Sequence, residues 1–255
     1  MGRLSGRTAI VTGAAEGLGV SYAKGLAAEG ANVCLVDVNS TEAVATDIRA
    51  AKTNDSGDVI TQVCDVSKPG EIAKMVKAAE DAFGTVHILV NNAAVFAQVT
   101  QTAFDELSDQ QWEQALSVNV RGVYECVKAV LPLMRKQNYG KIINITSGTV
   151  FRGTTGMLHY VASKGAVLAM TRSMANELGG YGIRCNCIAP GLVMTDPIAA
   201  RTDLDHVKQA MINARALKRA QKPEDLVGTV IYLASADSDF VSGQTIVVDG
   251  GSIFH

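Results

Sequence analysis

The chain has 255 residues, of which 47% are hydrophobic, and its formal net charge is −2. A chain of this length fits one large α/β domain with a sizeable core. The nearly balanced charge and the lack of an apolar run of roughly 18 residues favour neither nucleic acid nor a membrane as a partner. The amino terminus lacks the charged, apolar and small-residue order of a signal peptide, so we expect a cytoplasmic protein.

The five cysteines are scattered along the chain and odd in number. This usage favours buried free thiols in a reducing compartment over a disulfide framework. Neither the cysteines nor the four histidines have the spacing of metal ligands, so we expect no metal site.

Strand-like and helix-like segments alternate along the chain. Apolar strand patterns occupy residues 8–12, 32–37, 59–65, 86–91, 141–146, 184–189 and 245–249. Helical patterns occupy residues 18–29, 41–51, 70–83, about 108–136 with a kink or break at Pro132, 157–178 and 224–234. The alternation predicts a single domain over residues 1–255. Its fold class is α/β: a Rossmann-type, doubly wound sheet of seven parallel strands with helices on both faces.

The first predicted strand leads into a glycine-rich turn and then a helix. Gly13, Gly17 and Gly19 form the pattern Gly-x-x-x-Gly-x-Gly, with Leu18 inside it. Glycine permits a tight turn and a close backbone approach, and the free N–H groups of a helix N-terminus can bind a pyrophosphate. The turn therefore predicts a dinucleotide site.

Asp37 ends the second predicted strand, eighteen residues after Gly19, and Val38 follows it. A carboxylate here can accept hydrogen bonds from ribose hydroxyls and would repel the additional phosphate of NADP. Glu16 adds a second negative charge within the glycine turn. We therefore expect the cofactor to be NAD, with a helix-capping or turn role for Asp37 as the alternative.

Tyr160 and Lys164 are four residues apart in a predicted helix, so their side chains share one face. A neighbouring cation favours the phenolate and lowers the pKa of a phenol from its usual value of about 10. A general acid or base works best when its pKa is near the operating pH. The spacing therefore predicts a proton-transfer group, although ordinary surface pairs have the same spacing.

Several motifs, in order and spacing, resemble those of the short-chain dehydrogenase/reductase family over nearly the whole chain. The motifs are the glycine turn, Asp65-Val66, Asn91-Asn92-Ala93-Ala94, Ser117-Val118-Asn119-Val120, Ser147, Tyr160-x-x-x-Lys164, Pro190-Gly191 and the tail over residues 242–251. Ala94 departs from the family, which more often has glycine there.

The resemblance implies four catalytic residues. Tyr160 would be the general acid or base, and Lys164 would lower its pKa and hold the nicotinamide ribose. Ser147 would hydrogen-bond the substrate oxygen. Asn119 would bend its helix and hold a water that connects Lys164 to solvent.

The turn and the resemblance together imply a larger set of cofactor contacts. Asp65 would accept from the adenine amino group, and Asn91 would touch the adenosine side. The Val193 backbone and the Thr195 hydroxyl would bind the carboxamide, unless Thr195 only caps a helix. The full set is Gly13, Glu16, Gly17, Leu18, Gly19, Asp37, Val38, Asp65, Val66, Asn91, Ala93, Tyr160, Lys164, Pro190, Gly191, Val193 and Thr195.

The substrate contacts are expected beyond the carboxyl ends of the strands, where open α/β sheets bind ligands. The candidates are Val95, Phe96, Thr149, Val150, Phe151, Met157, Leu192 and Met194. Their apolar character favours a hydrophobic or aromatic secondary alcohol and its ketone, although some could be core residues. Residues 192–222 would form a lid, whose charges could recognise an acidic or polyol substrate or face water.

Three other functions are open. A 3-oxoacyl-thioester (acyl-carrier-protein) reductase would have a similar scaffold but an NADPH pocket, which Asp37 and Glu16 disfavour. The other two are a polyol or sugar dehydrogenase and a non-enzymatic nucleotide-sensing protein, although the latter should have lost one of Ser147, Tyr160 or Lys164. The resemblance also implies a homotetramer with a small-molecule substrate.

Overall fold

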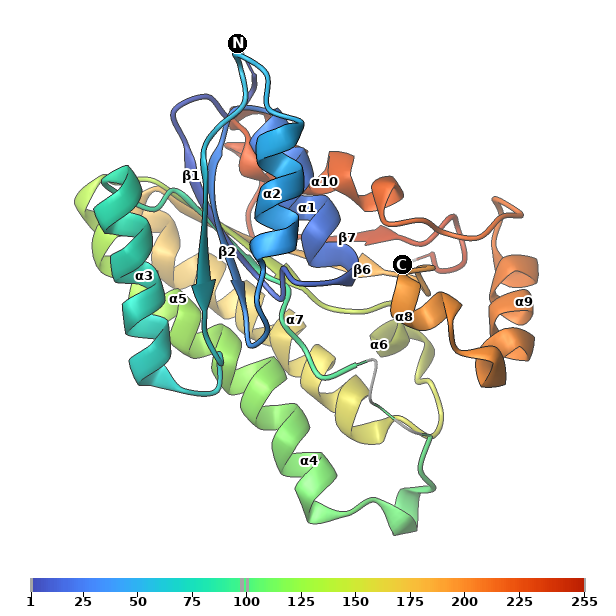
Figure 1. Ribbon diagram of the computed structural model, residues 1–255. Helices are drawn as coiled ribbons and strands as arrows, with labels where there is room; N and C mark the ends of the chain where they lie inside the picture. Colours follow the sequence, from blue (N-terminus) through green and yellow to red (C-terminus); the bar gives the residue numbers. More distant parts are fainter. Residues whose placement is uncertain (1, 97–98, 100, 255) are drawn as a thin grey trace.

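The computed structural model describes residues 2–96, 99 and 101–254, and its core is a seven-stranded parallel sheet in the order β3-β2-β1-β4-β5-β6-β7 (Figure 1). The predicted fold class is confirmed. The strands are β1 (Thr8–Thr12), β2 (Asn32–Asp37), β3 (Val59–Val63), β4 (Ile88–Asn91), β5 (Gly140–Ile145), β6 (Ile183–Pro190) and β7 (Thr245–Val248).

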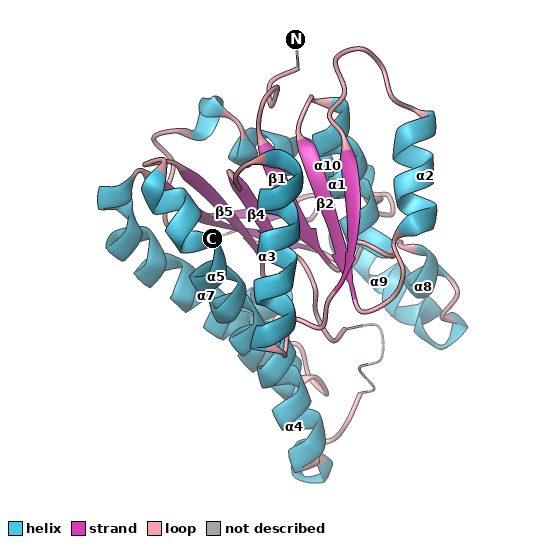
Figure 2. Ribbon diagram, turned by 60° about the vertical axis from the view of Figure 1, so that its left-hand side comes forward, coloured by secondary structure: helices cyan, strands magenta, loops and turns pink. Residues whose placement is uncertain are grey.

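Helices cover both faces of the sheet (Figure 2). The helices are α1 (Gly17–Ala28), α2 (Glu42–Ala50), α3 (Pro69–Phe83), α4 (Asp109–Leu116), α5 (Gly122–Lys136), α6 (Thr149–Arg152), α7 (Leu158–Leu178), α8 (Asp196–Ala199), α9 (Asp205–Ala214) and α10 (Glu224–Ala234). Side chains of α1, α2 and α10 pack in one apolar cluster, and side chains of α3, α5 and α7 pack in another.

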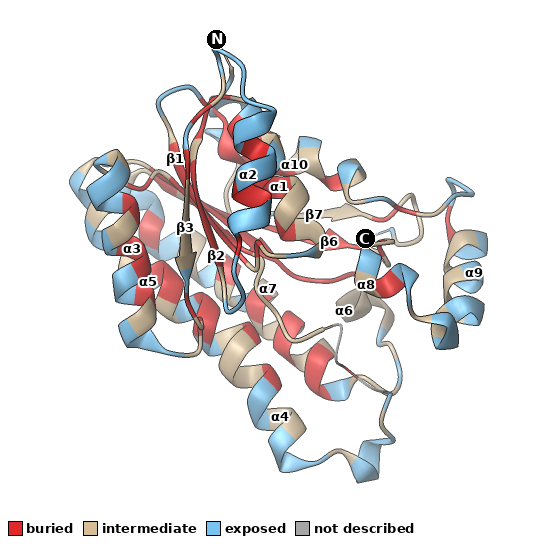
Figure 3. Ribbon diagram, viewed as in Figure 1, coloured by how far each residue is buried: buried red, intermediate tan, exposed pale blue. Residues whose placement is uncertain are grey.

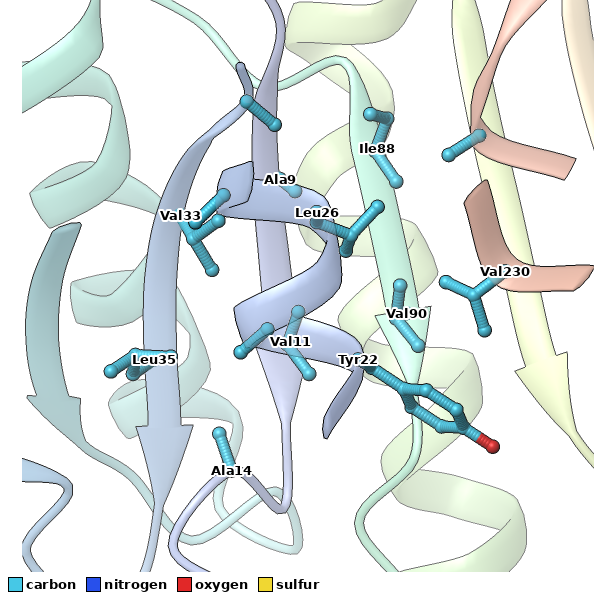
Figure 4. Packing of buried hydrophobic residues seen from close by; sticks show 14 of the residues in the cluster. Ala9, Val11, Ala14, Tyr22, Leu26, Val33, Leu35, Ile88, Val90 and Val230 are labelled. Carbon is cyan, nitrogen blue, oxygen red and sulfur yellow. The ribbon is translucent and has the colours of Figure 1, made fainter. Parts of the chain in front are cut away.

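The strands supply both clusters because successive side chains point to opposite faces of a sheet. In β2, Val33 and Leu35 belong to the cluster under α1, while Cys34 and Val36 belong to the other cluster. The central strands β1, β4 and β5 are consequently fully buried and β2 and β6 nearly so, whereas the edge strands β3 and β7 are mostly half-buried (Figure 3). Figure 4 shows the α1 side, where Tyr22 packs with apolar strand residues.

The long helix predicted over residues 108–136 is divided at a different point. A π-helical turn over Ser117–Arg121 separates α4 from α5, whereas α5 continues through Pro132. Pro132 is exposed, as is Lys128, whose carbonyl the proline leaves without an intrahelical donor, so water can serve that carbonyl. The break predicted at Pro132 is therefore wrong. A capping box of Ser108 and Gln111 is present at the start of α4.

Burial tests the expectation about the cysteines. All five cysteines are buried and free, as predicted. Val167 on α7 is fully buried and packs with Val123 and Cys187 inside the molecule. Within the described residues, no helix is long and apolar enough to cross a membrane, and no group of three or more potential ligand side chains could hold a metal ion.

Candidate active site

A cavity of about 810 Å³ lies beyond the carboxyl ends of the strands. Its lining comes from the segments that follow β1 to β6, which the parallel sheet brings to one edge. This is the edge at which open α/β sheets bind ligands.

The glycine turn forms one wall of this cavity. Gly13 and Gly17 have φ angles of +67° and +62°, which residues with a Cβ atom rarely adopt. A Cβ at Gly19 would lie 1.9 Å from the carbonyl oxygen of Gly13, so only glycine allows the turn to close onto α1. Gly13 and Gly17 line the cavity, but Gly19 lies behind it and shapes the turn rather than its surface.

Asn92 fastens this turn to the end of β4. Its side-chain amide donates to the carbonyl oxygens of Thr12 and Gly13 at 2.9 and 3.0 Å. The Thr12 hydroxyl accepts from the backbone N–H groups of Asn92 and Ala93. The sequence motif contained Asn92, but its role was missed because the bond joins residues about 80 positions apart.

The wall that follows β1, β2 and β3 is acidic. Asp37 accepts from the backbone N–H of Ala15 at 3.1 Å and from that of Asn39 at 2.9 Å. These bonds hold its carboxylate against the glycine turn, and α2 starts only at Glu42, so Asp37 does not cap a helix. The Asp65 carboxylate is likewise oriented, because it accepts a hydrogen bond from the Ser67 hydroxyl at 2.7 Å.

The glycine cradle and these oriented carboxylates fit a dinucleotide. The cradle exposes backbone at the start of α1, where a pyrophosphate binds, and a side chain at Gly13 would collide with Ala93. The carboxylate of Asp37 lies one strand away, at the position from which it can accept ribose hydroxyls.

Ser147, Tyr160 and Lys164 line the same cavity, as predicted. Tyr160 and Lys164 are only 5% and 3% exposed, and the ammonium nitrogen of Lys164 lies 5.9 Å from the centroid of the Tyr160 ring. Lys164 Nζ donates to the Ile145 carbonyl at 2.8 Å, which directs the side chain along the end of β5.

Burial controls the protonation of this pair. It raises the pKa of Tyr160 to about 12, although a hydrogen bond with Ser147 acts in the opposite direction. It also lowers the pKa of Lys164 to about 8. The expected lowering of the Tyr160 pKa by Lys164 is therefore not found: Lys164 does not contribute to the shift, and burial sets its direction. At neutral pH the phenol is protonated and available as an acid.

Asn119 lies inside the π-helical turn and is fully buried. Its carbonyl oxygen accepts from the Val95 N–H at 2.8 Å, and its amide donates to the Ser163 hydroxyl at 3.0 Å. Ser163 in turn donates to the Tyr160 carbonyl at 2.7 Å. Asn119 thus joins the cavity loop to the helix that carries Tyr160 and Lys164, and a π-helical turn lies at the position of the predicted bend.

The loop after β6 forms a wall of the cavity next to the glycine turn. Thr195 precedes α8, but its side chain makes no capping hydrogen bond. Its methyl group lies 3.6 Å from the position of a Cβ on Gly17, so Thr195 lies directly against the glycine turn. Capping of α8 therefore does not explain this residue.

Two residues missed in the sequence hold this loop. Arg215 is buried and donates to the Leu192 carbonyl at 2.6 Å. Gln221 accepts from the Met194 N–H through its backbone at 2.8 Å and donates its side-chain amide to Val248. No local sequence pattern predicts these long-range contacts.

The structure divides the expected ligand residues into two groups. Of the candidates for the substrate, Val95, Phe96, Thr149, Met157 and Leu192 line the cavity, and the Phe96 ring lies 5.0 Å from that of Tyr160. The lining does not include Val150, Phe151 or Met194. Of the cofactor set, Gly19 and Asn91 are absent from the lining, whereas the other members are part of it: Gly13, Glu16, Gly17, Leu18, Asp37, Val38, Asp65, Val66, Ala93, Tyr160, Lys164, Pro190, Gly191, Val193 and Thr195.

Asn91 is withdrawn from the cavity because its side chain pairs within the core. Its amide donates to Asn144 at 2.8 Å, and Asn144 donates to Thr171 on α7 at 2.8 Å. These hydrogen bonds connect β4, β5 and α7 beneath the cavity floor. The expected contact of the Asn91 side chain with adenosine is therefore not formed by this conformation.

The predicted lid segment forms a wall of the cavity through α8 and α9. The residues of this segment that line the cavity around α8 and α9 are Pro197, Ile198, Arg201, Leu204, Val207 and Met211. Most of its other charged side chains face water, including Asp203, Asp205 and His206. Further lining residues that the sequence did not single out are Gln101, Gln114, Arg152 and Thr154.

Comparisons with known proteins agree with this geometry. A family model described as enoyl-(acyl carrier protein) reductase matches residues 13–252. A 3-oxoacyl-[acyl-carrier-protein] reductase of Staphylococcus epidermidis is 36% identical over 248 residues, which cover 96% of this chain and 98% of the relative. A 3-alpha-(or 20-beta)-hydroxysteroid dehydrogenase of Mycobacterium bovis is 38% identical over 252 residues, covering 99% and 91%. The crystal structure of levodione reductase superimposes with a TM-score of 0.90 at 30% identity, covering 97% of each chain.

Proposed function

Because the chain belongs to the short-chain dehydrogenase/reductase family, an oxidoreductase family that uses nicotinamide cofactors, we propose that it is an NAD(H)-dependent enzyme interconverting a secondary alcohol and its ketone. The observation that carries this proposal is the convergence of Ser147, Tyr160 and Lys164 at a cavity that also contains the glycine cradle.

The chain's own residues account for proton transfer. When bound, the nicotinamide supplies or accepts the hydride. In ketone reduction the carbonyl carbon gains that hydride and its oxygen gains the phenolic proton of Tyr160, so a neutral alcohol forms. Ser147 can donate to the same oxygen and stabilise its developing charge. Alcohol oxidation reverses these transfers, with the Tyr160 phenolate as the base.

The preference for NAD over NADP rests on charge. Glu16, Asp37 and Asp65 line the cavity after β1, β2 and β3, and Asp37 is fixed there by two backbone N–H groups. The nearby Lys68 lies 3.5 Å from Asp65 and 3.4 Å from Glu71, so its charge is already shared between two carboxylates. An added 2′-phosphate would meet net negative charge.

The substrate is proposed to have an apolar body. Val95, Phe96, Met157 and Leu192 line the cavity around Tyr160, and Leu204, Val207 and Met211 extend this apolar surface along the wall formed by residues 192–222. The hydroxysteroid dehydrogenase relative is named for a secondary alcohol on a large hydrocarbon frame, which is consistent with this reading.

A 3-oxoacyl-thioester reductase is the second candidate. The Staphylococcus epidermidis relative carries that name and matches nearly the whole chain. The fixed carboxylate of Asp37 argues for NAD(H) in either case. Reduction of a 3-oxoacyl thioester of the acyl carrier protein at a higher kcat/KM than any simple ketone would favour this candidate.

A homotetramer is proposed from exposed apolar side chains. Tyr124 on α5 and Leu158 on α7 are exposed, as are Phe240 and Phe254 around the C-terminal strand. These side chains would be covered if their elements form subunit contacts, as the family resemblance implies. Sedimentation velocity of the purified chain should give a tetramer, and a monomer would exclude this assembly.

The test of the proposed activity is Tyr160→Phe, with Tyr22→Phe as the matched control. Initial rates would be measured with a panel of ketones and NADH. Loss of the phenolic proton should lower kcat by about 10²- to 10⁴-fold while NADH still binds. Tyr22 is buried outside the cavity and its hydroxyl has no hydrogen-bond partner among the described residues, so its variant should retain full activity. Undiminished turnover in Tyr160→Phe would contradict the mechanism.

A further inference from the structure

The charges that line the cavity are separated across the sheet. The acidic side chains Glu16, Asp37 and Asp65 follow β1, β2 and β3, whereas Arg152 and Arg201 follow β5 and β6. Among the described residues that line the part of the cavity after β5 and β6, none carries a carboxylate. The part of the cavity beside Ser147 and Tyr160 is therefore electropositive.

Arg152 lies in this part of the cavity with weak acceptors for its guanidinium. It ends α6, five residues after Ser147, and its side chain is 25% exposed. Nη1 donates to the Met211 sulfur at 2.8 Å, and Nη2 donates to the Ser252 hydroxyl. A thioether is a weak acceptor, whereas a guanidinium has the fork of donors that fits a carboxylate.

The carboxylate paired with Arg152 does not hydrogen-bond its guanidinium. Asp249 Oδ2 lies 3.7 Å from Nη2, which is beyond hydrogen-bond distance, and it has no other hydrogen-bond partner among the described residues. The second oxygen, Oδ1, accepts from the backbone N–H groups of Gly251 and Ser252, both at 3.0 Å. The Asp249 carboxylate is thus oriented by the backbone rather than by Arg152.

Asp249 also serves a second guanidinium. Arg215 is buried against Gly250, is attracted by Asp249 and is repelled by Arg152. Its hydrogen bonds go to neutral acceptors, the carbonyls of Leu192 and Arg219 among them. Asp225 also attracts Arg215, but it pairs with Arg219 at 2.6 Å. Asp249 is therefore the carboxylate shared by Arg152 and Arg215, which leaves excess positive charge next to the cavity.

Arg201, the other arginine of the lining, differs from Arg152. Its guanidinium donates to both oxygens of Asp203, at 3.1 and 2.7 Å, so its charge is compensated by a bidentate pair. Arg152 is thus the lining arginine whose charge is less well compensated.

We propose that the substrate carries a carboxylate in addition to its carbinol or carbonyl group, and that Arg152 binds this carboxylate. The carboxylate oxygens would replace Met211 as the acceptor of the guanidinium, and the apolar body of the substrate would lie against Phe96, Met157 and Leu192. The proposed substrate is therefore an oxo acid or hydroxy acid with an apolar body. This inference rests on the proposed oxidoreductase function and specifies its substrate class.

The test compares each acid with its neutral ester, so that the readout is a ratio within one enzyme preparation. The probes are 2-oxo-4-phenylbutanoate and 4-oxo-4-phenylbutanoate, each with its methyl ester. NADH oxidation gives kcat/KM for every member. Calorimetric titration of the same compounds into the NADH complex gives binding that does not depend on turnover.

The variants are Arg152→Met, Arg152→Lys and Arg49→Met. Arg49 is half exposed on α2, outside the cavity lining, and serves as the arginine control. Loss of Arg152 leaves Asp249 with less compensation, so the double variant Arg152→Met/Asp249→Asn is included in case the single variant does not fold.

The wild-type protein should prefer at least one acid over its ester by about tenfold or more, as expected for a hydrogen-bonded ion pair. Arg152→Met should bring this ratio to about one, Arg152→Lys should retain part of it, and Arg49→Met should leave it unchanged. Equal use of acid and ester by the wild-type protein, or a preference that survives in Arg152→Met, would overturn the proposal. Stronger use of a matched oxo phosphonate would also overturn the carboxylate assignment.

Failure of the proposed function gives a different result. If the acids bind to the NADH complex with the expected dependence on Arg152 but no ketone is reduced, the carboxylate site stands and the oxidoreductase assignment fails. If ketone esters are reduced but acids have no advantage in rate or binding, the oxidoreductase assignment stands and the carboxylate site fails.

Discussion

The ammonium of Lys164 lies 5.9 Å from the centroid of the Tyr160 ring. Burial shifts the pKa values of both groups so that each favours its neutral form. Burial raises the pKa of Tyr160 to about 12 and lowers that of Lys164 to about 8. Lys164, which is charged at neutral pH, therefore costs the folded protein free energy there. Functional sites commonly carry such costs.

Lys164→Met should stabilise the protein while abolishing turnover. A lysine whose folded pKa is about 8 instead of the ordinary 10.5 is penalised below pH 8, where both folded and unfolded states are protonated. The penalty disappears as the pH rises from 8 to 10.5, because the unfolded state then binds more protons. The variant should gain up to about 3 kcal/mol of unfolding free energy at pH 7.

Urea denaturation of Lys164→Met and wild-type protein at several pH values measures this effect. The difference between the two proteins should shrink between pH 8 and pH 10.5, and a difference independent of pH would contradict the assignment of the penalty to Lys164.

Asp37→Asn should relax the preference for NAD. The amide can still accept one of the two backbone hydrogen bonds from Ala15 and Asn39, but it no longer repels a 2′-phosphate. Charges about 4 Å apart near a protein surface interact by about 1–4 kcal/mol, so the ratio of kcat/KM for NAD to that for NADP should fall at least about fivefold.

Initial rates with both cofactors test the role of Asp37. Asp47→Asn is the control, since Asp47 pairs with Lys24 on the surface and should leave the ratio unchanged. Wild-type activity with NADP equal to or better than that with NAD would refute the predicted cofactor preference.

Gly19→Ala should damage the cofactor site, whereas Gly228→Ala should not. The new Cβ at position 19 would lie 1.9 Å from the Gly13 carbonyl and 2.9 Å from the Asn92 amide nitrogen, so the cradle must move. We expect a loss of about 1–3 kcal/mol of unfolding free energy from overpacking. The dissociation constant for NADH, measured by fluorescence, should rise about tenfold or more, as a loss of about 1.4 kcal/mol of binding free energy gives.

Gly228 lies inside α10, where a Cβ would meet nothing within 4 Å. Alanine there should raise the unfolding free energy by about 0.5–1 kcal/mol through helix propensity and leave NADH binding unchanged. A Gly19→Ala protein that binds NADH like the wild type would show that the turn tolerates a side chain.

Asn119→Ala should lower both stability and kcat. The substitution leaves the Val95 N–H without its acceptor and the Ser163 hydroxyl without its donor. A buried polar group that loses its partner costs about 1–3 kcal/mol. Because Ser163 bonds the Tyr160 carbonyl, the placement of the general acid should also suffer, with kcat lowered more than KM is changed.

Thermal unfolding and steady-state kinetics of Asn119→Ala would be compared with Asn54→Ala, a substitution at an exposed turn. Wild-type kcat in Asn119→Ala, at a temperature where the variant is folded, would restrict Asn119 to a purely structural role.

The sequence alone predicted the architecture because local patterns encode it. Apolar runs marked all seven strands, and the boundaries differed by two residues or fewer. Strand β3 ends at Val63 rather than at Asp65 because Asp65 turns the chain, accepting from the backbone and hydroxyl of Ser67. The four catalytic candidates were also readable, since each belongs to a short motif with a fixed place relative to a strand or helix.

Contacts between distant segments were decided only by the tertiary structure. Asn92 fastens the glycine turn from about 80 residues away, and Asn91, its neighbour in sequence, is used inside the core. The break of the long helix depends on Asn119 bonding Val95 and Ser163 rather than on Pro132, which tolerates its place because it faces water.

The proton affinities of Tyr160 and Lys164 show the same division. Their spacing determined that they share a helical face, and this is a local property of 3.6 residues per turn. The direction of their pKa shifts depends on how much water the whole fold removes, which no local pattern encodes. The same holds for Arg152, whose position against Asp249, Met211 and Ser252 exists only because three distant segments meet beside the cavity.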